Sequence, residues 1–93
     1  MTNKYEVALV LSVASGDETV NALKEKFNDL IAKNGTVENV DEWGKRRLAY
    51  PINDETEGYY IFTTMTCEPT LPAELERVAG ITEGVLRIMV IKK

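Results

Sequence analysis

The chain has 93 residues, which is the length of one small domain and leaves no room for a second. Hydrophobic residues make up 44% of the sequence and charged residues 28%, a balance that is typical of a folded globular protein and excludes a disordered chain. The single cysteine, Cys67, excludes an internal disulfide, and the lack of histidine excludes His-based acid–base catalysis and a zinc cluster. We therefore expect one domain over residues 1–93.

The charges exclude a protein whose whole surface attracts nucleic acid, because 11 basic and 15 acidic residues give a net charge of −4. One basic cluster stands out, at Lys45, Arg46 and Arg47. No apolar run approaches the roughly 18 residues of a membrane span, and the first residues lack the layout of a signal peptide. We expect a cytoplasmic protein whose contacts with nucleic acid, if it has any, are local.

The first third of the chain predicts a strand followed by a helix. Alternating apolar residues over residues 4–13 predict the strand, with opposite facings for two sets, Val7, Leu9 and Leu11 toward a core and Ala8 and Val10 outward. Ser15-x-x-Glu18 matches a capping box, and apolar residues at helical spacing predict a helix that Gly35 ends. The lysines of this helix, Lys24, Lys26 and Lys33, are expected to lie on its solvated face.

The middle of the chain predicts a hairpin. Residues 36–52 form a long strand pattern in which Gly44 marks a bulge and Pro51 confines the far end to a sheet edge. Residues 53–58 are a polar turn, and residues 59–67 are dense in β-branched and aromatic side chains. The alternation in this strand predicts a buried set, Ile61, Met65 and Cys67, and an outward pair, Tyr60 and Phe62.

The last third predicts a short helix and a final strand. Thr70 is the expected N-cap of the helix, Leu71, Leu75 and Val78 form its apolar face, and Gly80 ends it. The final strand covers residues 85–92. Its pattern leaves open whether Leu86, Ile88 and Val90 or Arg87 and Met89 face the core.

The order β-α-β-β-α-β predicts an α+β, ferredoxin-like fold, with a four-stranded antiparallel sheet and both helices on one face. Strands spaced about 4.8 Å apart make this sheet roughly 19 Å wide, so two helices cover one face only. The other face stays open and carries apolar groups, among them Tyr60 and Phe62. An exposed apolar patch of that kind usually marks a binding surface.

The candidate catalytic groups are better explained by structure. Most carboxylates lie on helix faces or turns, and Cys67 lies on the buried side of its strand without a histidine to activate it. The loop at residues 12–18 carries Asp17 and Glu18 but no basic residue, so it cannot cradle a phosphate as acyl phosphate hydrolases of this fold do. We expect no enzyme, no catalytic residue, no metal and no cofactor.

The segment around the basic cluster is the strongest candidate for binding. Arg46 and Arg47, with Tyr50 nearby, suit contacts with an RNA backbone, because the guanidinium group offers several donors to phosphate and stacks on aromatic rings. A charged edge strand that resists aggregation explains the same residues. Composition alone favours neither explanation.

Several segments resemble one family. The run from Trp43 to Ile52, WGKRRLAYPI, resembles the signature of the bacterial small-subunit ribosomal protein six family, whose members carry a Gly-basic-Arg-x-Leu-Ala-Tyr-Pro-Ile run. Tyr5-Glu6-Val7, Gly58-Tyr59-Tyr60 and residues 85–90 resemble the same family in the same order. The similarity covers residues 4–93.

The resemblance implies a structural constituent of the small ribosomal subunit, without enzymatic activity. Family members bind the central domain of the small-subunit rRNA together with ribosomal protein eighteen, and neither a membrane nor a small-molecule substrate is implied. Matching positions imply rRNA contacts at Lys4, Lys45, Arg46, Arg47 and Arg87. Tyr50 falls near the surface shared by protein and RNA, and the outward Tyr60 and Phe62 extend the expected surface for the partner protein.

Two departures from the family pattern predict weak RNA affinity for the chain alone. Asn3-Lys4 stands where relatives often have two basic residues, and residues 54–58 are acidic where some relatives have lysines. An alternative function uses the same open face: a small-ligand regulatory domain or a homo-oligomer. That class predicts self-association and no response to rRNA.

Overall fold

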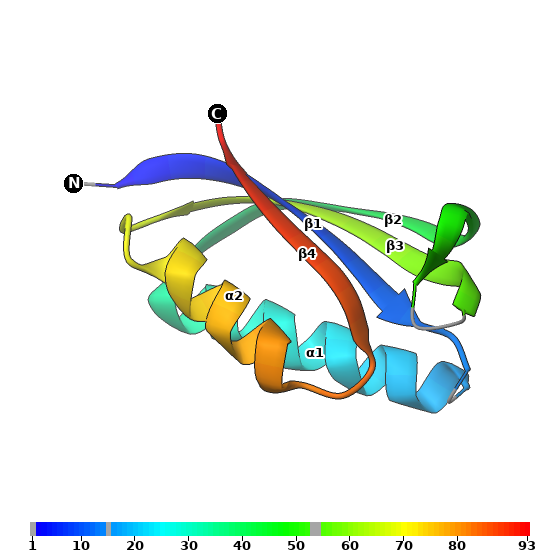
Figure 1. The fold of residues 1–93 in the computed structure, drawn as a ribbon. Coiled ribbons are helices and arrows are strands. Elements are labelled where there is room, and N and C mark those ends of the chain that lie inside the picture. The colour runs from blue at the N-terminus through cyan, green and yellow to red at the C-terminus, as the bar shows by residue number, and fades with distance from the viewer. Residues whose placement is uncertain (1, 15, 53–54) are drawn as a thin grey trace.

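The computed structural model describes residues 2–14, 16–52 and 55–93, and it confirms the predicted order of elements. The elements are β1 (Asn3–Ser12), α1 (Asp17–Asn34), β2 (Gly35–Ile52), β3 (Glu55–Cys67), α2 (Leu71–Ile81) and β4 (Val85–Lys92). The strands form one antiparallel sheet in the order β2-β3-β1-β4, so β2 and β4 are its edges. Both helices lie against the same face of this sheet, and the other face is free of helices (Figure 1).

The core lies between the helices and the sheet. The predicted faces of β1 and β3 point into it, and Leu11 and Met65 are fully buried. Cys67 is 1% exposed, as its position in the strand pattern predicted. The helices contribute their apolar stripes, which consist of Val20, Leu23, Phe27, Ile31, Leu71, Leu75 and Ala79.

Pairing with β1 decides the facing of β4, which the sequence pattern left open. Ile88 and Val90 pair with β1 residues and pack against the core, as does Val85. The register shifts near Leu11, so that Leu86 has no partner in β1 and Val85 takes the inward position. The opposite set therefore faces the open side and consists of Arg87, Met89 and Ile91.

The helix ends differ from the prediction in detail. The capping box falls on Ser15, which lies outside the described residues, and Gly16 holds the N-cap position of α1. Thr70 precedes α2 as predicted but makes no side-chain capping hydrogen bond. Gly80 does not end α2, because the helix continues to Ile81 and the N–H of Thr82 donates to the carbonyl of Ala79.

The hairpin is present, but its turn is shorter than predicted. β3 begins at Glu55, so the acidic residues up to Gly58 belong to the strand, while Asn53 and Asp54 lie outside the described residues. Pro51 lies on an edge strand, as predicted. The expected bulge is at Gly44, where φ is +77° and the register with β3 shifts.

Candidate functional site

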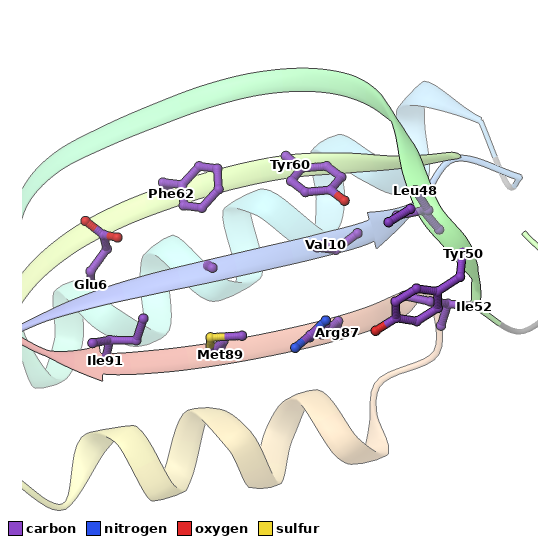
Figure 2. A pocket seen from close by; sticks show the side chains of 12 residues that line it. Glu6, Val10, Leu48, Tyr50, Ile52, Tyr60, Phe62, Arg87, Met89 and Ile91 are labelled. Atoms are coloured by element: carbon purple, nitrogen blue, oxygen red, sulfur yellow. The ribbon is translucent and has the colours of Figure 1, made fainter. Parts of the chain in front are cut away.

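The open face of the sheet carries a hollow of about 290 Å³. Tyr60 and Phe62 of β3 line it, as the alternation in the sequence predicted (Figure 2). Arg87 and Met89 line it from the edge strand β4, and Glu6 lies at the end nearest the chain termini. The lining is mainly apolar with a few charged groups, which is the composition of a site that binds a partner.

Part of β2 bends over this face and forms one wall of the hollow. We call residues 48–52 the covering segment. The pairing with β3 jumps from Arg47–Glu57 to Ile52–Glu55, so residues 48–51 have no partners among the described residues of β3 and bow away from the strand (Figure 2). Leu48 is buried, whereas Tyr50 is 62% exposed.

The exposure of Val10 differs from the prediction. It faces the open side, as expected, but it is only 6% exposed because it lies near Gly58 and Leu48. A Cβ atom at Gly58 would come within 2.5 Å of Val10 Cγ1 and 3.4 Å of Leu48 Cδ2. The covering segment therefore closes part of a face that the sequence predicted to be open.

Three aromatic rings lie in contact in a row from the hollow to the edge strand β2. Trp43 packs on Phe62 with ring centroids 4.6 Å apart and an interplanar angle of 53°. Phe62 in turn lies 6.4 Å from the Tyr60 ring. These separations are those of attractive aromatic pairs. The Trp43 indole N–H donates to a carboxylate oxygen of Asp41 at 3.0 Å.

The basic cluster is divided between the two sides of β2. Lys45 lies opposite Tyr59, which packs toward the helices, and Arg46 lies opposite Gly58, which faces the open side. Arg47 shares the side of Lys45, because alternate residues of a strand point the same way. All three side chains are exposed, and none has an ion pair within the described part of the chain.

The other two predicted RNA contacts lie at different ends of the sheet. Arg87 lines the hollow at the end where Arg46 lies, but from the opposite edge strand. Lys4 pairs with Thr66, eight positions along β3 from the partner of Arg46, a distance of about 26 Å at a strand rise of about 3.3 Å. Lys4 Nζ also lies 3.6 Å from a carboxylate oxygen of Glu38. The fold thus brings Arg46 and Arg87 to one end and leaves Lys4 apart.

A charged cluster that the sequence did not predict lies beside the basic cluster of Lys45, Arg46 and Arg47. Lys24 Nζ and the Tyr59 hydroxyl both donate to Glu42 Oε1, each at 2.8 Å. The hydrogen bond from Lys24 is the main cause that lowers the pKa of Glu42, and the same bond raises the pKa of Lys24. Lys24 is therefore not a freely solvated lysine, because it ties α1 to β2 just before the bulge.

The acidic start of β3 has a structural role. Glu55 accepts a hydrogen bond from the Ser12 hydroxyl, which joins β3 to the end of β1. Glu57 lies opposite Arg47 in the sheet, although no ion pair joins them. The negative charge of these two residues disfavours anions at the start of β3.

The remaining groups that could carry chemistry are inert or scattered. Burial is the main cause that raises the pKa of the Cys67 thiol, which disfavours the reactive thiolate. Within residues 2–14, 16–52 and 55–93, no three Asp, Glu, Cys or His side chains gather as metal ligands would. No helix in the same ranges combines the length and the apolar character that crossing a bilayer demands.

Comparison with known proteins identifies one family. The family described as "Ribosomal protein S6" matches residues 4–92. The small ribosomal subunit protein bS6 of Clostridium novyi (strain NT) is 51% identical over 88 residues, which cover 94% of this chain and 93% of that protein. The bS6 protein of Clostridium perfringens (strain SM101 / Type A) is 50% identical over 91 residues, which cover 97% and 96%.

A solved structure supports the fold. The crystal structure of 30S ribosomal protein S6 from Thermotoga maritima matches with a TM-score of 0.92 and covers 100% of this chain and 89% of that one. The two sequences are 23% identical, so this likeness bears on the ferredoxin-like architecture alone.

Proposed function

Because the chain belongs to the ribosomal protein S6 family, we propose that it binds the central domain of the small-subunit rRNA jointly with ribosomal protein eighteen. As a small-subunit ribosomal protein, it works on the ribosome in the cytoplasm. Its role is structural, and no reaction is assigned to it. The observation that carries the proposal is an open sheet face with a hollow, bordered at one end by exposed basic side chains that form no ion pair with any residue the structure describes.

The basic side chains supply the RNA contacts. Arg46 and Arg87 approach one end of the open face from opposite edges of the sheet, and Lys45 and Arg47 extend the positive charge along β2. Cations that form no ion pair with other described residues are available to neutralise phosphates, and guanidinium groups bind phosphate through several donors. Lys4 is an accessory contact, because it is distant from the others and already lies near Glu38.

The hollow supplies the contact with the partner protein. Tyr50 is exposed on the covering segment, and Tyr60 and Phe62 are half-buried beside it. Tyrosine and phenylalanine are favoured at protein interfaces, because they bury a large area at a small loss of conformational entropy. A partner seated here also lies next to Arg46 and Arg87, so that protein and RNA can be bound together.

Reconstitution tests this function. Small subunits lacking the protein are mixed with the native chain, with Arg46→Ala/Arg47→Ala, or with a control variant, Lys26→Ala/Lys33→Ala, which removes the same charge from α1. After a high-salt wash, we expect the native and control chains to sediment with the subunits and the arginine variant to be lost several-fold more. Circular dichroism shows whether the variants are folded.

Two results contradict the proposal. If the arginine variant and the control are retained equally, Arg46 and Arg47 do not contribute to binding. Self-association at micromolar concentration, together with indifference to rRNA and to ribosomal protein eighteen, supports the alternative of a regulatory or homo-oligomeric domain.

A further inference from the structure

The sole tryptophan of the chain is unusually exposed for so large an apolar side chain. Trp43 is 48% exposed on the edge strand β2, although one side of it packs on Phe62. It does not line the hollow that the proposed partner protein would fill. The basic cluster follows Trp43 in the chain directly after Gly44, and binding of a partner in the hollow does not explain why the ring is exposed.

We propose that Trp43 is a stacking platform for an unpaired nucleobase of RNA whose phosphates are held by Arg46. This inference rests on the proposed RNA contact and adds recognition of single-stranded RNA to it. Aromatic side chains bind bases of single strands by stacking, which tolerates any sequence because every base has a π-face.

The neighbouring residues hold the Trp43 ring in place. Trp43 is the extra residue of the Gly44 bulge, since Glu42 and Gly44 pair with consecutive residues of β3. Phe62 supports the ring, and Asp41 holds the indole N–H at 3.0 Å. A ring held in place loses little conformational freedom when a ligand binds, which favours affinity.

The charges near the ring favour RNA over a second protein. Arg46 follows Trp43 by three positions, or about 10 Å of strand, and has no ion pair in the part of the chain that the structure describes. Asp41 lies on the other side of Trp43 in the chain, so a phosphate is expected only toward Arg46. An aromatic ring beside an unpaired cation matches a nucleotide, which has both a base and a phosphate.

The test uses the fluorescence of Trp43, which has no other tryptophan to obscure it. The native chain is titrated at low ionic strength with a labelled single-stranded oligoadenylate and with an RNA duplex. Anisotropy of the label reports binding of any kind, and tryptophan fluorescence reports stacking. We expect the single strand to quench the fluorescence and the duplex to leave it unchanged, because stacked base pairs do not offer a free base face.

Two variants separate stacking from charge. Trp43→Leu keeps an apolar group on Phe62 but removes the ring, and we expect it to bind the single strand roughly 5- to 150-fold more weakly, the effect of losing one stacked base. Trp43→Phe keeps a ring and is expected to retain most of the affinity. Circular dichroism confirms that both variants are folded.

Three results overturn the inference. In the first, the single strand binds without quenching and Trp43→Leu binds it as tightly as the native chain does. This result would show that Trp43 does not stack on a base, but it would leave the RNA contact of Arg46 and the proposed function intact. Quenching by ribosomal protein eighteen and not by RNA assigns Trp43 to the protein interface. Absence of oligonucleotide binding at low ionic strength removes the single-strand site, while the reconstitution experiment still decides the proposed function.

Discussion

At the scale of single residues, the atoms around a glycine decide whether a larger residue can replace it. Gly35 has an extended backbone with φ of −174°, which any residue can adopt, but a Cβ atom there would lie 2.6 Å from the carbonyl oxygen of Thr66. Gly80, in the last turn of α2, has nothing within 4 Å of the same position. The two glycines look alike in the sequence, yet only Gly35 is needed for close packing.

Alanine substitutions at these glycines should act in opposite directions. We expect Gly80→Ala to raise the free energy of unfolding by about 0.5 kcal/mol, because alanine loses less backbone entropy in a helix. Gly35→Ala should lower it by about 1–3 kcal/mol, the usual range for overpacking. Urea denaturation measures both, and a stable Gly35→Ala variant would show that β2 and β3 can move apart at little cost.

The Lys24–Glu42–Tyr59 cluster is a residue-scale feature with a pH signature. Glu42 has a lowered pKa in the folded chain, so it stabilises the fold above the ordinary pKa of a glutamate, about 4.3. This contribution is lost as the pH falls through the lowered pKa. Because the Glu42 side chain is 42% exposed, solvent screening keeps the effect small.

Substitution of Glu42 should reveal this dependence. We expect Glu42→Gln to lower the free energy of unfolding by about 0.5–1 kcal/mol at pH 7, and the difference from the native chain to disappear near pH 2. Denaturation at a series of pH values measures it. Glu25→Gln, on the exposed face of α1, is the control, and an equal loss in both variants would mean that Glu42 has no special role.

At the scale of elements, the covering segment matters most, because it converts a flat face into a hollow. Leu48 is 8% exposed and anchors the segment above Gly58. We expect Leu48→Ala to lower the free energy of unfolding by about 2–3 kcal/mol. Ile81→Ala is the control, because Ile81 is 75% exposed and its loss should change stability by less than about 0.5 kcal/mol.

Hydrogen exchange shows whether Leu48 acts locally. In Leu48→Ala, the amides of residues 48–50 and of Ile52 should exchange faster relative to those of β1 than they do in the native chain. A uniform increase over the whole sheet would contradict the view that Leu48 mainly holds the covering segment in place.

Most elements could be predicted because their patterns are local. The alternation in β1 and β3 and the helical spacing in α1 follow from which side chains are buried, and the structure confirms them. The covering segment could not be predicted, because it depends on how β2 and β3 pair rather than on either strand alone. The same holds for β4, whose facing depends on how it pairs with β1.

The candidate site was predictable in composition but not in arrangement. The run at residues 43–52 pointed to a binding segment, and Tyr60 and Phe62 face the open side as expected. The sequence did not show which of Lys45 and Arg46 faces the open side, because the bulge at Gly44 shifts the register of β2. Nor did it separate Lys4 from the other basic residues, since that needs the strand order.

At the scale of the whole molecule, the net charge is −4, although positive side chains gather at one end of the sheet. Lys45, Arg46, Arg47 and Arg87 lie at the end of the sheet where RNA is expected, and none of them has an ion pair among the described residues. If all of them contact phosphates, the plot of log affinity against log salt concentration should have a slope of about −3 to −4. Arg87→Ala should make that slope shallower by about 1. An unchanged slope would exclude Arg87 from the interface.

The central claim is that one surface holds RNA and a partner protein together. Its most direct test is the affinity of the chain for a central-domain rRNA fragment, measured by filter binding with and without saturating ribosomal protein eighteen. We expect about tenfold tighter binding with the partner present, and the same affinity with and without the partner for Tyr50→Ala. Equal affinity with and without the partner would contradict it.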